Sequence, residues 1–536
     1  MPSSRRKQFT PAIADLTPVA EFELNAAVPA NADAVAIFLF SDSKPEQMVL
    51  AEISKDIQQI VAGVLARGDF KAKAGAWQAI PGAGSLPRII LLGLGKVAEF
   101  VKDQEDLIRW AGARTVQAAQ SLKLRNMLVH PGVLLNETGA RGWADLAPAF
   151  AEGAVLGGFS FKAYKSGKSG EDKSEGAAKT AGVSAAKTVR VILSRISPAS
   201  ANEIAVASQV QIAAATNYAR HMACQPANVV NPATLVSEAR RLARQIGLRC
   251  TVLDAKAAAR LGMGGLLAVG QGSQTPPAMI FLEYNPPVGR RGQSPVVIVG
   301  KAVTFDTGGI SIKPAADMGA MKYDKCGGMA VLGIMRAVAG IGLNQRVIGV
   351  IPTAENSVDA AAYRPGDIIR MYNGKTVDVT NTDAEGRMIL ADALAYACEK
   401  YQPRAIADMA TLTGGVVTAL GGVFAGLMTN QDQIAAEMVI AGQKTGEWLW
   451  RLPLHPRYAK LLESPHADFT NSGGREAHPI QGGMFLNEFV PENIPWAHLD
   501  IAGTANPRKE QRYISGDNAS GFGVRLMVEY LRSLPE

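Results

Sequence analysis

Short apolar runs alternate with segments of helical length along most of the chain, and this alternation is the strongest constraint on the fold. In the first third, the helix-length segments include residues 46–67 and 104–123. The apolar runs between them are VAIFLF at 35–40, RIILLGLG at 88–95, NMLVH at 126–130 and VRVILS at 189–194. Because strands that alternate with helices build βαβ units, the pattern predicts an α/β layer with a largely parallel sheet.

A second series of apolar runs follows a long helical pattern that begins near residue 200. These runs are PVVIVGK at 295–301, RVIGVIPT at 346–353, TVDVTN at 376–381, RAIADMATLTGG at 404–415 and WAHLDIAG at 496–503. A chain of 536 residues is too long for one ordinary core. We therefore predict an α/β fold of two domains, each a mostly parallel or mixed sheet flanked by helices. The N-terminal domain would span 1–195 and the larger C-terminal domain 196–536, with a linking helix at about 200–222.

Composition and targeting signals favour a cytoplasmic protein. The chain is 47% hydrophobic and 19% charged, which is typical of a soluble globular protein. No apolar run reaches the ~18 residues of a membrane helix, and the basic N-terminus MPSSRRKQFT has no apolar core behind it. The four cysteines show no CxxC and no regular spacing, so we expect reduced thiols. They are Cys224, Cys250, Cys326 and Cys398.

Residues 165–187 are rich in Gly, Ser, Ala and Lys and have no periodic apolar face. This composition predicts a mobile surface loop. Lys and Arg outnumber Asp and Glu across 162–190. A solvated loop is the simpler interpretation, and a basic contact arm is the alternative. The net charge of +7 is modest for this length and does not by itself imply nucleic acid.

Several nucleotide and hydrolase motifs are missing or incomplete. The segment LLGLGK at 91–96 lacks the spacing of a phosphate loop, and GQGSQT at 270–275 lacks the third glycine of a dinucleotide fingerprint. The six histidines include no HExxH, and no Gly-x-Ser-x-Gly occurs. Zincins and serine hydrolases with a nucleophile elbow are therefore excluded.

A set of charged residues lies where predicted strands end or turns begin. VGKAVTFDTGG carries Lys301 and Asp306, SIKPAADMGAMKYDKCGG carries Lys313 and Asp324, and NTDAEGR carries Asp383, Glu385 and Arg387. In open α/β sheets, that edge is where ligands bind. Four converging carboxylates repel one another, and two bridged divalent cations would relieve that repulsion. Structural salt bridges to the basic residues are the alternative, and we favour the metal site because the whole set lies between apolar strands.

These motifs also carry a resemblance. NTDAEGR followed by LADAL, together with VGKAVTFDTGG, MKYDKCGG, ATLTGG and WAHLDIAG, resembles the leucyl aminopeptidase (cytosol aminopeptidase) family of metallopeptidases. The motifs follow the family's order, and the resemblance is close from about residue 205 to the end. It implies that the C-terminal domain is catalytic and that the chain is a hydrolase, a leucyl aminopeptidase that removes N-terminal residues, mostly apolar ones such as Leu, from peptides.

The resemblance assigns roles to matching positions. It implies two divalent metal ions, zinc or manganese, one held by Asp306, Asp383 and Glu385 and the other by Lys301, Asp306, Asp324 and Glu385. Lys301 would have to be neutral to act as a ligand. Lys313 and Arg387 would be the catalytic pair, with Lys313 stabilising the oxyanion and Arg387 holding a bicarbonate ion that shuttles the proton. The substrate channel would be lined by Thr411, Leu412, Thr413 and Gly414.

The resemblance also implies partners and leaves alternatives open. Relatives form hexamers, and some bacterial relatives bind DNA, so a hexameric DNA-binding accessory protein is the second hypothesis. A structural assembly protein without catalysis is the third, and the intact ligand set argues against it. The sequence departs from the family at Lys325, where an apolar residue is usual, and at Gly482-Gly483, where alanines are usual. The glycine pair predicts a slightly roomier pocket, and the sequence leaves the direction of the Lys325 side chain open.

Overall fold

The computed structural model describes residues 18–25, 27, 32–42, 53–82, 86–132, 134, 139, 141–164, 188–286, 293–507, 512–514 and 518–535. The chain divides into two compact units. The N-terminal unit comprises Ala14–Asn217 with Gln511–Gly516, and the C-terminal unit comprises Tyr218–Glu510 and Asp517–Glu536. The predicted loop at 165–187 lies outside the described residues. Helix α5 (Ser200–Cys224) runs across the division, and the domain boundary predicted after residue 195 stays a prediction.

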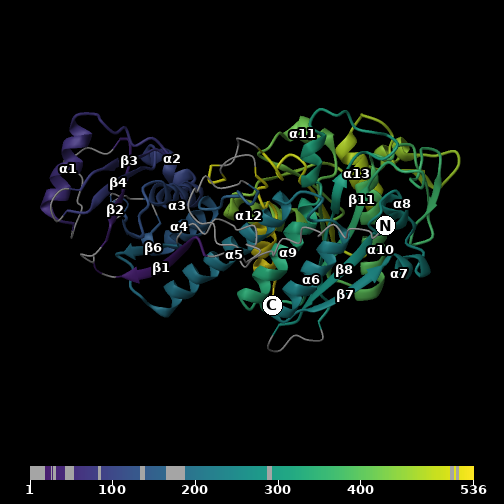
Figure 1. Ribbon diagram of the computed structural model, residues 1–536, viewed down its shortest axis with the longest axis horizontal. Helices are drawn as coiled ribbons and strands as arrows, with labels where there is room; N and C mark the ends of the chain where they lie inside the picture. Colours follow the sequence, from purple (N-terminus) through teal and green to yellow (C-terminus); the bar gives the residue numbers. More distant parts are fainter. Residues whose placement is uncertain are drawn as a thin grey trace, which may run out of the picture. The chain divides into compact units, whose positions relative to one another are not determined.

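Among the described residues of the N-terminal unit, six strands form one mixed sheet in the order β1-β6-β5-β2-β4-β3. Figure 1 labels β1, β2, β3, β4 and β6 of this sheet. Only the β3–β4 pair is antiparallel among these neighbours. The strands are β1 (Ala20–Asn25), β2 (Ala34–Leu39), β3 (Trp77–Ile80), β4 (Arg88–Gly93), β5 (Asn126–His130) and β6 (Val189–Ser194). The four predicted apolar runs supply β2, β4, β5 and β6, and the α/β fold class is confirmed.

Besides the first part of α5, the described helices of this unit are α1 (Lys55–Ala66), α2 (Val97–Lys102), α3 (Gln104–Ser121) and α4 (Trp143–Gly157). Of these, α3 and α4 pack closely because glycines remove side chains at their contact. A Cβ on Gly153 of α4 would lie 1.9 Å from the Arg109 carbonyl oxygen of α3. At the same contact, Arg109 Nε donates to Glu152 Oε2 at 3.0 Å, and both side chains are buried. The two helices therefore meet through small residues and one buried ion pair.

In the described part of the C-terminal unit, nine strands form the main sheet. Its order is β16-β15-β18-β14-β9-β11-β8-β7, and β10 pairs with β11 outside this path. The strands are β7 (Arg249–Asp254), β8 (Ala278–Tyr284), β9 (Val296–Gly300), β10 (Ala302–Asp306), β11 (Val347–Asn356), β14 (Ala405–Ala410), β15 (Ala425–Thr429), β16 (Leu449–Arg451) and β18 (Trp496–Asp500). The central pairs β18–β14, β14–β9 and β9–β11 are parallel.

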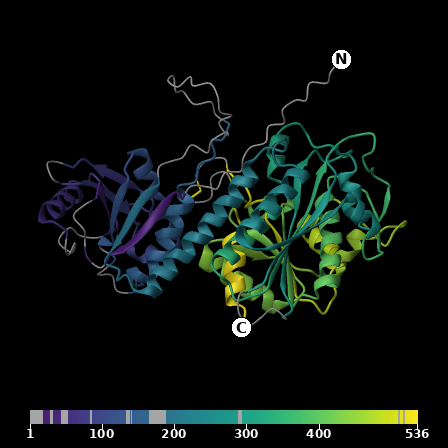
Figure 2. The ribbon, with the colours of Figure 1, turned by 60° about the horizontal axis from the view of Figure 1, so that its bottom comes forward.

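Helices cover the main sheet, which runs through the middle of the unit (Figure 2). They are α6 (Pro232–Ile246), α7 (Ala255–Arg260), α8 (Gly264–Gly270), α9 (Cys326–Gly340), α10 (Glu385–Tyr401), α11 (Gly414–Leu420), α12 (Asp432–Thr445), α13 (His478–Asn487) and α14 (Val524–Ser533), with 3-10 turns η3 (Met318–Tyr323) and η4 (Pro456–Leu462). The central strands β9 and β14 are buried throughout and are apolar except for Asp408, as expected for parallel strands covered on both faces. No helix in the described ranges is long and apolar enough to cross a membrane.

A small sheet and the parallel order of the main sheet together position the polar segments. The described strands of the small sheet are β12 (Ile368–Arg370), β13 (Thr376–Asp378) and β17 (Phe469–Thr470). In the main sheet, the parallel strands β9, β14 and β18 end at Gly300, Ala410 and Asp500. Since the carboxyl ends of parallel strands share one edge, the segments that follow them meet there.

Candidate active site

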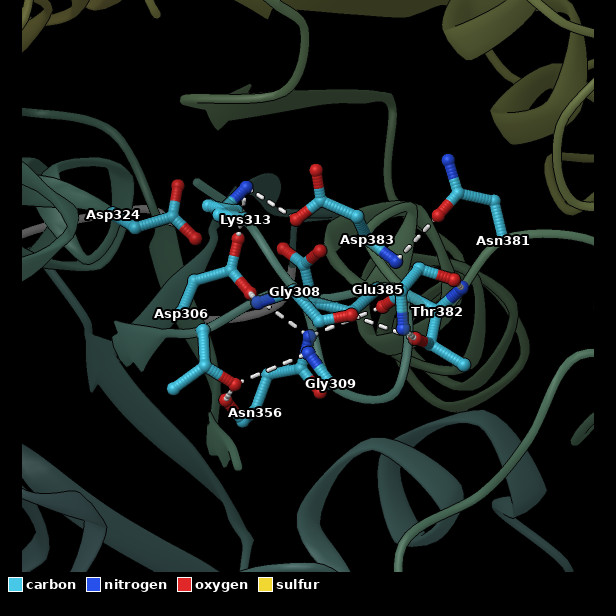
Figure 3. Close-up of polar contacts among 12 residues, drawn as sticks. Asp306, Gly308, Gly309, Lys313, Asp324, Asn356, Asn381, Thr382, Asp383 and Glu385 are labelled. Atoms are coloured by element: carbon cyan, nitrogen blue, oxygen red, sulfur yellow. Dashed lines mark hydrogen bonds and ion pairs between the residues drawn. The ribbon is translucent and has the colours of Figure 1, made fainter. Parts of the chain in front are cut away.

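The predicted site residues converge on one pocket at this edge of the sheet. The pocket has a volume of about 780 Å³, and all of the predicted site residues except Arg387 line it. They are Lys301, Asp306, Lys313, Asp324, Asp383, Glu385, Thr411, Leu412, Thr413 and Gly414. Figure 3 shows the carboxylates of Asp306, Asp324, Asp383 and Glu385 facing one another, with Lys313 between Asp306 and Asp383. The clustering argued from strand ends is present, whereas the role of each residue stays a prediction.

Three of these carboxylates form a buried cluster. Asp306, Asp324 and Glu385 each offer an oxygen atom within 4.8 Å of the others. Their residues are 2%, 7% and 2% exposed, respectively, so water does not screen the repulsion among them. Burial, together with the charges of Glu385 and Asp306, raises the pKa of Asp324 well above its ordinary value, although Lys301 opposes the shift. A cluster of this kind can hold a cation.

Lys301, the residue between β9 and β10, contacts two carboxylates of this cluster. Its Nζ lies 2.8 Å from Asp324 Oδ2 and 2.8 Å from Glu385 Oε1, and it donates to the Thr411 carbonyl at 2.9 Å. Burial lowers the pKa of Lys301, but the charges of Asp324 and Glu385 outweigh burial and raise the pKa above its ordinary value. The ammonium is therefore retained only because the carboxylates surround it.

Lys313 reaches the same cluster from the loop after β10. Its Nζ lies 2.9 Å from Asp306 Oδ2 and also forms an ion pair with Asp383. Burial and the charges of Glu385 and Asp306 raise the pKa of Asp383 to about 7, although Lys313 lowers it. Four carboxylates thus share two lysines.

Hydrogen bonds from residues that the sequence did not identify hold the ligand-bearing loops. Asn356 at the end of β11 donates to Asp306 Oδ1 at 2.8 Å and to the Thr382 carbonyl at 3.1 Å. The Tyr363 hydroxyl donates to the same carbonyl at 2.8 Å. Gly309 has φ +64°, and a Cβ there would lie 2.8 Å from Asn356 Oδ1. A glycine is therefore needed where the loop after Asp306 meets the NTDAEGR segment.

Asp500 at the end of β18 orients the segment at 411–414. Its Oδ1 accepts from the Leu412 amide at 3.1 Å, and its Oδ2 accepts from the Thr413 hydroxyl at 2.6 Å. Burial raises the pKa of Asp500, although His498 and the Thr413 hydrogen bond lower it. The sequence did not identify Asp500 for this role.

Arg387 lies in the first turn of α10 and does not line the pocket. The residue is 1% exposed, and its Nη1 donates to the Asn471 carbonyl at 2.8 Å. Its Nε is buried and has no hydrogen-bond partner among the described residues. Burial lowers the pKa of Arg387 to about 10, although the charges of Glu385 and Asp500 oppose the shift. The guanidinium keeps an unsatisfied donor beside the pocket.

The structure resolves the direction of Lys325, which the sequence left open. The side chain is fully buried, and its Nζ donates to the carbonyls of Gln225, at 2.8 Å, and Lys322. It therefore points away from the carboxylates. The roomier pocket predicted from Gly482-Gly483 stays a prediction, although a Cβ on Gly482 would lie only 2.8 Å from Leu412 Cδ2. The side chain of Leu412 fills the space that an alanine would take.

Family models match both parts of the chain. The model of the cytosol aminopeptidase family catalytic domain matches residues 217–528, and the model of the family's N-terminal domain matches residues 35–168. The chain belongs to the cytosol aminopeptidase family. A probable cytosol aminopeptidase of Aquifex aeolicus is 40% identical over 500 residues, covering 93% of this chain and 94% of the relative. Another, from Desulforapulum autotrophicum, is 38% identical over 526 residues, covering 96% and 98%.

Solved structures support the same assignment for this family member. A mutant of tomato leucine aminopeptidase superposes with a TM-score of 0.81 at 30% identity, covering 98% of each chain. The bottromycin maturation enzyme BotP in complex with Mn has a TM-score of 0.80 at 33% identity, covering 94% of this chain and 99% of that one. The predicted family is confirmed, and the chain is a peptidase, a metal-dependent aminopeptidase.

Proposed function

We propose that the enzyme hydrolyses the N-terminal residue, Leu or another mostly apolar residue, from peptides with two divalent cations at the carboxylate cluster. The observation that carries the proposal is the set of three buried carboxylates with oxygens within 4.8 Å of one another. Bridging carboxylates of this kind are the ligands that two-metal hydrolytic sites use. Zinc and manganese are the proposed cations, and the manganese complex of the related BotP is consistent with the second.

The residues present fit a divalent cation by charge. Asp306, Asp324, Asp383 and Glu385 carry four negative charges when ionised, and only Lys301 and Lys313 lie in ion-pair distance of them in the described structure. Two negative charges thus remain without a counter-ion. The raised pKa values of Asp324 and Asp383 have the same cause, because buried carboxylates repel one another. Positive charge supplied by metal ions would remove that cost.

One cation would be held by Asp306, Asp383 and Glu385, including the Asp383 carbonyl oxygen. The other would be held by Lys301, Asp306, Asp324 and Glu385. When bound, the cations supply a Lewis acid and lower the pKa of a water molecule between them. As a ligand, Lys301 would have to be neutral, and the charge of a metal ion among the same carboxylates would lower its pKa.

The chain's own residues perform the remaining tasks. Lys313 would donate to the oxyanion of the scissile carbonyl, since its present partners Asp306 and Asp383 would then serve as metal ligands. Arg387 holds a bicarbonate ion, which carries the proton because a guanidinium does not act as a base. Thr411, Leu412, Thr413 and Gly414 line the substrate channel. Small or apolar side chains of the same pocket favour an apolar N-terminal residue; they are Ala320, Met321, Val417, Ala502 and Ala505.

We further propose that the enzyme is cytoplasmic and forms a hexamer, as the resemblance implies. Sedimentation tests the second point, and a species with only the monomer mass at working concentration would contradict it. For the alternative role in DNA binding, no support comes from the described residues, because most of the basic stretch at 162–190 lies outside them. A gel shift measured against salt concentration tests that alternative.

The direct test is hydrolysis of leucyl-p-nitroanilide by chelated protein before and after metal is added back. We expect activity to disappear on chelation and to return with zinc or manganese, with cobalt and magnesium as comparisons. Metal content is measured by mass spectrometry on the same samples. Full activity in a sample shown to be free of metal would contradict the two-metal proposal.

A further inference from the structure

His478 lies in the wall of the active-site pocket, and neither the sequence motifs nor the proposed mechanism gives it a role. It is the first residue of α13 and is half-buried. It lines the same pocket as the carboxylates. A Cβ on Gly415 of α11 would lie 2.9 Å from His478 Cβ, so the absence of a side chain at Gly415 makes room for the histidine. The imidazole is therefore packed into the pocket wall rather than projecting from the surface.

The face of α13 that carries His478 is turned toward Arg387. Gly482 follows His478 by four residues and so lies on the same side of the helix. A Cβ on Gly482 would lie 3.8 Å from Arg387 Nη2 and 3.5 Å from Thr413 Cγ2. Burial, and then the positive charge of Arg387, lowers the pKa of His478 to about 4. The positive charge of the buried guanidinium thus acts on a neutral imidazole in the pocket wall.

Both side chains contain nitrogen atoms that have no hydrogen-bond partner among the described residues. Within the described ranges, neither ring nitrogen of His478 has a hydrogen-bond partner, although the residue is half-buried. Nε of Arg387 is buried and likewise has none. A buried donor without a partner, such as this Nε, is rare in folded proteins and calls for an explanation such as a bound ion or water. His478 itself lines the pocket, where a ligand can reach it.

We propose that His478 is a positioning residue for the anion held by Arg387, with its neutral imidazole as the second hydrogen-bonding partner of that anion. This inference rests on the proposed function, in which the anion is bicarbonate. A guanidinium only donates, so it cannot accept a hydrogen bond from the protonated oxygen of bicarbonate. A neutral imidazole can present either the nitrogen that accepts to that hydroxyl group or the nitrogen that donates to an unprotonated oxygen.

The neutrality of the imidazole matters for the reaction. A second cation beside Arg387 would bind the anion more tightly. It would also favour carbonate over bicarbonate, so the pKa of the anion would fall and the anion would accept a proton less readily. A neutral partner adds a hydrogen bond without adding charge. His478 would therefore orient bicarbonate while leaving it able to accept and release a proton. The imidazole does not transfer a proton in the reaction, so its substitution should weaken binding of the anion.

The experiment compares His478→Ala, His478→Gln and His466→Ala in the zinc-loaded enzyme. His466 is an exposed histidine and serves as the matched control. The bicarbonate concentration for half-maximal stimulation of leucyl-p-nitroanilide hydrolysis is measured at fixed pH, with chloride keeping the ionic strength constant. We expect an increase on the order of tenfold for His478→Ala, as for loss of one hydrogen bond to a charged group. His478→Gln, whose amide can donate and accept, should recover most of that loss, and His466→Ala should match the wild type.

NMR spectra of enzyme labelled with 13C-histidine provide a readout that does not depend on activity. The ring-carbon resonance that is missing from the spectrum of His478→Ala is assigned to His478. Added bicarbonate should shift that resonance in the wild type but not in Arg387→Ala. An unshifted signal would overturn the inference, as would an unchanged half-stimulating concentration in His478→Ala or a wild type that bicarbonate does not stimulate. Failure of the proposed function is seen separately, as absence of hydrolysis by metal-loaded wild type, and the spectrum still decides the role of His478 in that case.

Discussion

The two units are built alike around a central sheet, but they bury charge in different ways. In the described part of the N-terminal unit, the buried Arg and Glu side chains are Arg109 and Glu152, which pair with each other at 3.0 Å. The C-terminal unit buries many more charged groups, and those at the carboxyl edge of its sheet include Lys301, Asp306 and Glu385. The first arrangement is neutral, whereas the second has an excess of negative charge.

The difference separates charge that holds elements together from charge that binds a ligand. A buried pair that neutralises itself between two helices fixes their packing and needs nothing from outside. A cluster with an excess of one sign is unfavourable until a counter-ion arrives, so it persists only where function requires it. The layered architecture is similar in the two units and does not distinguish them. The unbalanced buried charge does distinguish them, because only the C-terminal unit has such a cluster among the described residues.

The largest effect is expected when the unbalanced cluster loses a shared carboxylate. Glu385→Ala would remove a ligand from both cations, so bound metal and hydrolysis should both be lost. Thermal stability in the presence of metal should fall as well, because the wild type gains stability from ligand binding and the variant would not. Metal content by mass spectrometry, measured beside kcat and Tm, tests the expectation. A variant that keeps both metal ions would show that Glu385 does not bridge them.

Arg387→Ala should separate proton handling from metal binding in the same cluster. We expect both metal ions to be retained and kcat to fall by ~10²–10⁴-fold, the usual contribution of a positioned acid or base. Added bicarbonate should stimulate the wild type and do much less for the variant. Metal analysis read beside kcat decides the matter. Loss of metal as complete as in Glu385→Ala would make Arg387 a structural partner of the carboxylates.

The neutral pair of the N-terminal unit should respond in the opposite way. Glu152→Ala would leave Arg109 buried and weakly paired with the partly exposed Glu105, at a cost of ~3–5 kcal/mol in the free energy of unfolding. Metal content and the kcat of the folded enzyme should stay near the wild-type values. Replacing both members of the pair with leucine should recover much of the stability. Loss of metal in Glu152→Ala would break the comparison between the two units.

Much of this contrast was predictable from sequence because strand ends identify one edge of a sheet. The apolar runs gave β2, β4, β5 and β6 of the N-terminal sheet, but β1 (AEFELN) and β3 (WQAI) were missed. Both are edge strands of partly exposed residues, so neither has a continuous apolar run. Polar residues after apolar runs likewise predicted the cluster of Lys301, Asp306 and Glu385.

The supporting residues of the site could not be predicted in this way. Asn356 contacts Asp306 from 50 positions away, and Asp500 reaches Leu412 from 88 positions away. Only the folded chain brings such groups together, because their separation follows the order of strands in the sheet rather than a local spacing. His478 follows no strand, and nothing in its own segment indicates the pocket. The direction of Lys325 depended on carbonyl groups of other segments for the same reason.

Lowering the pH should reduce the free energy of unfolding through His221, a buried residue of the C-terminal unit. Burial lowers the pKa of His221 from 6.5 to about 4, although the Glu238 charge opposes the shift. Below pH 6.5 the unfolded chain binds a proton at this position and the folded chain does not, so stability falls until the pH reaches about 4. The loss amounts to at most ~3 kcal/mol. In metal-free protein, His221→Gln should show a correspondingly weaker fall in the free energy of unfolding across this window, and a parallel fall in both proteins would contradict the assignment.

The smallest effect is expected for Lys325→Met, because Lys325 lies in the C-terminal unit but outside the unbalanced cluster. Burial lowers its pKa to about 8, so the ammonium is costly to keep, and its hydrogen bonds to Gln225 and Lys322 offset that cost. Methionine has a similar volume and needs no hydrogen bonds, although it leaves two carbonyl groups without their donor. The two changes oppose each other, so the free energy of unfolding should change by less than ~1.5 kcal/mol.

Lys325→Ala, which also leaves a cavity, should lower the free energy of unfolding by ~2–4 kcal/mol. Both variants should keep their metal and a kcat within about threefold of the wild type, because the Lys325 side chain points away from the carboxylates. Loss of metal in Lys325→Met but not in a surface control such as His466→Ala would place Lys325 among the groups that hold Asp324.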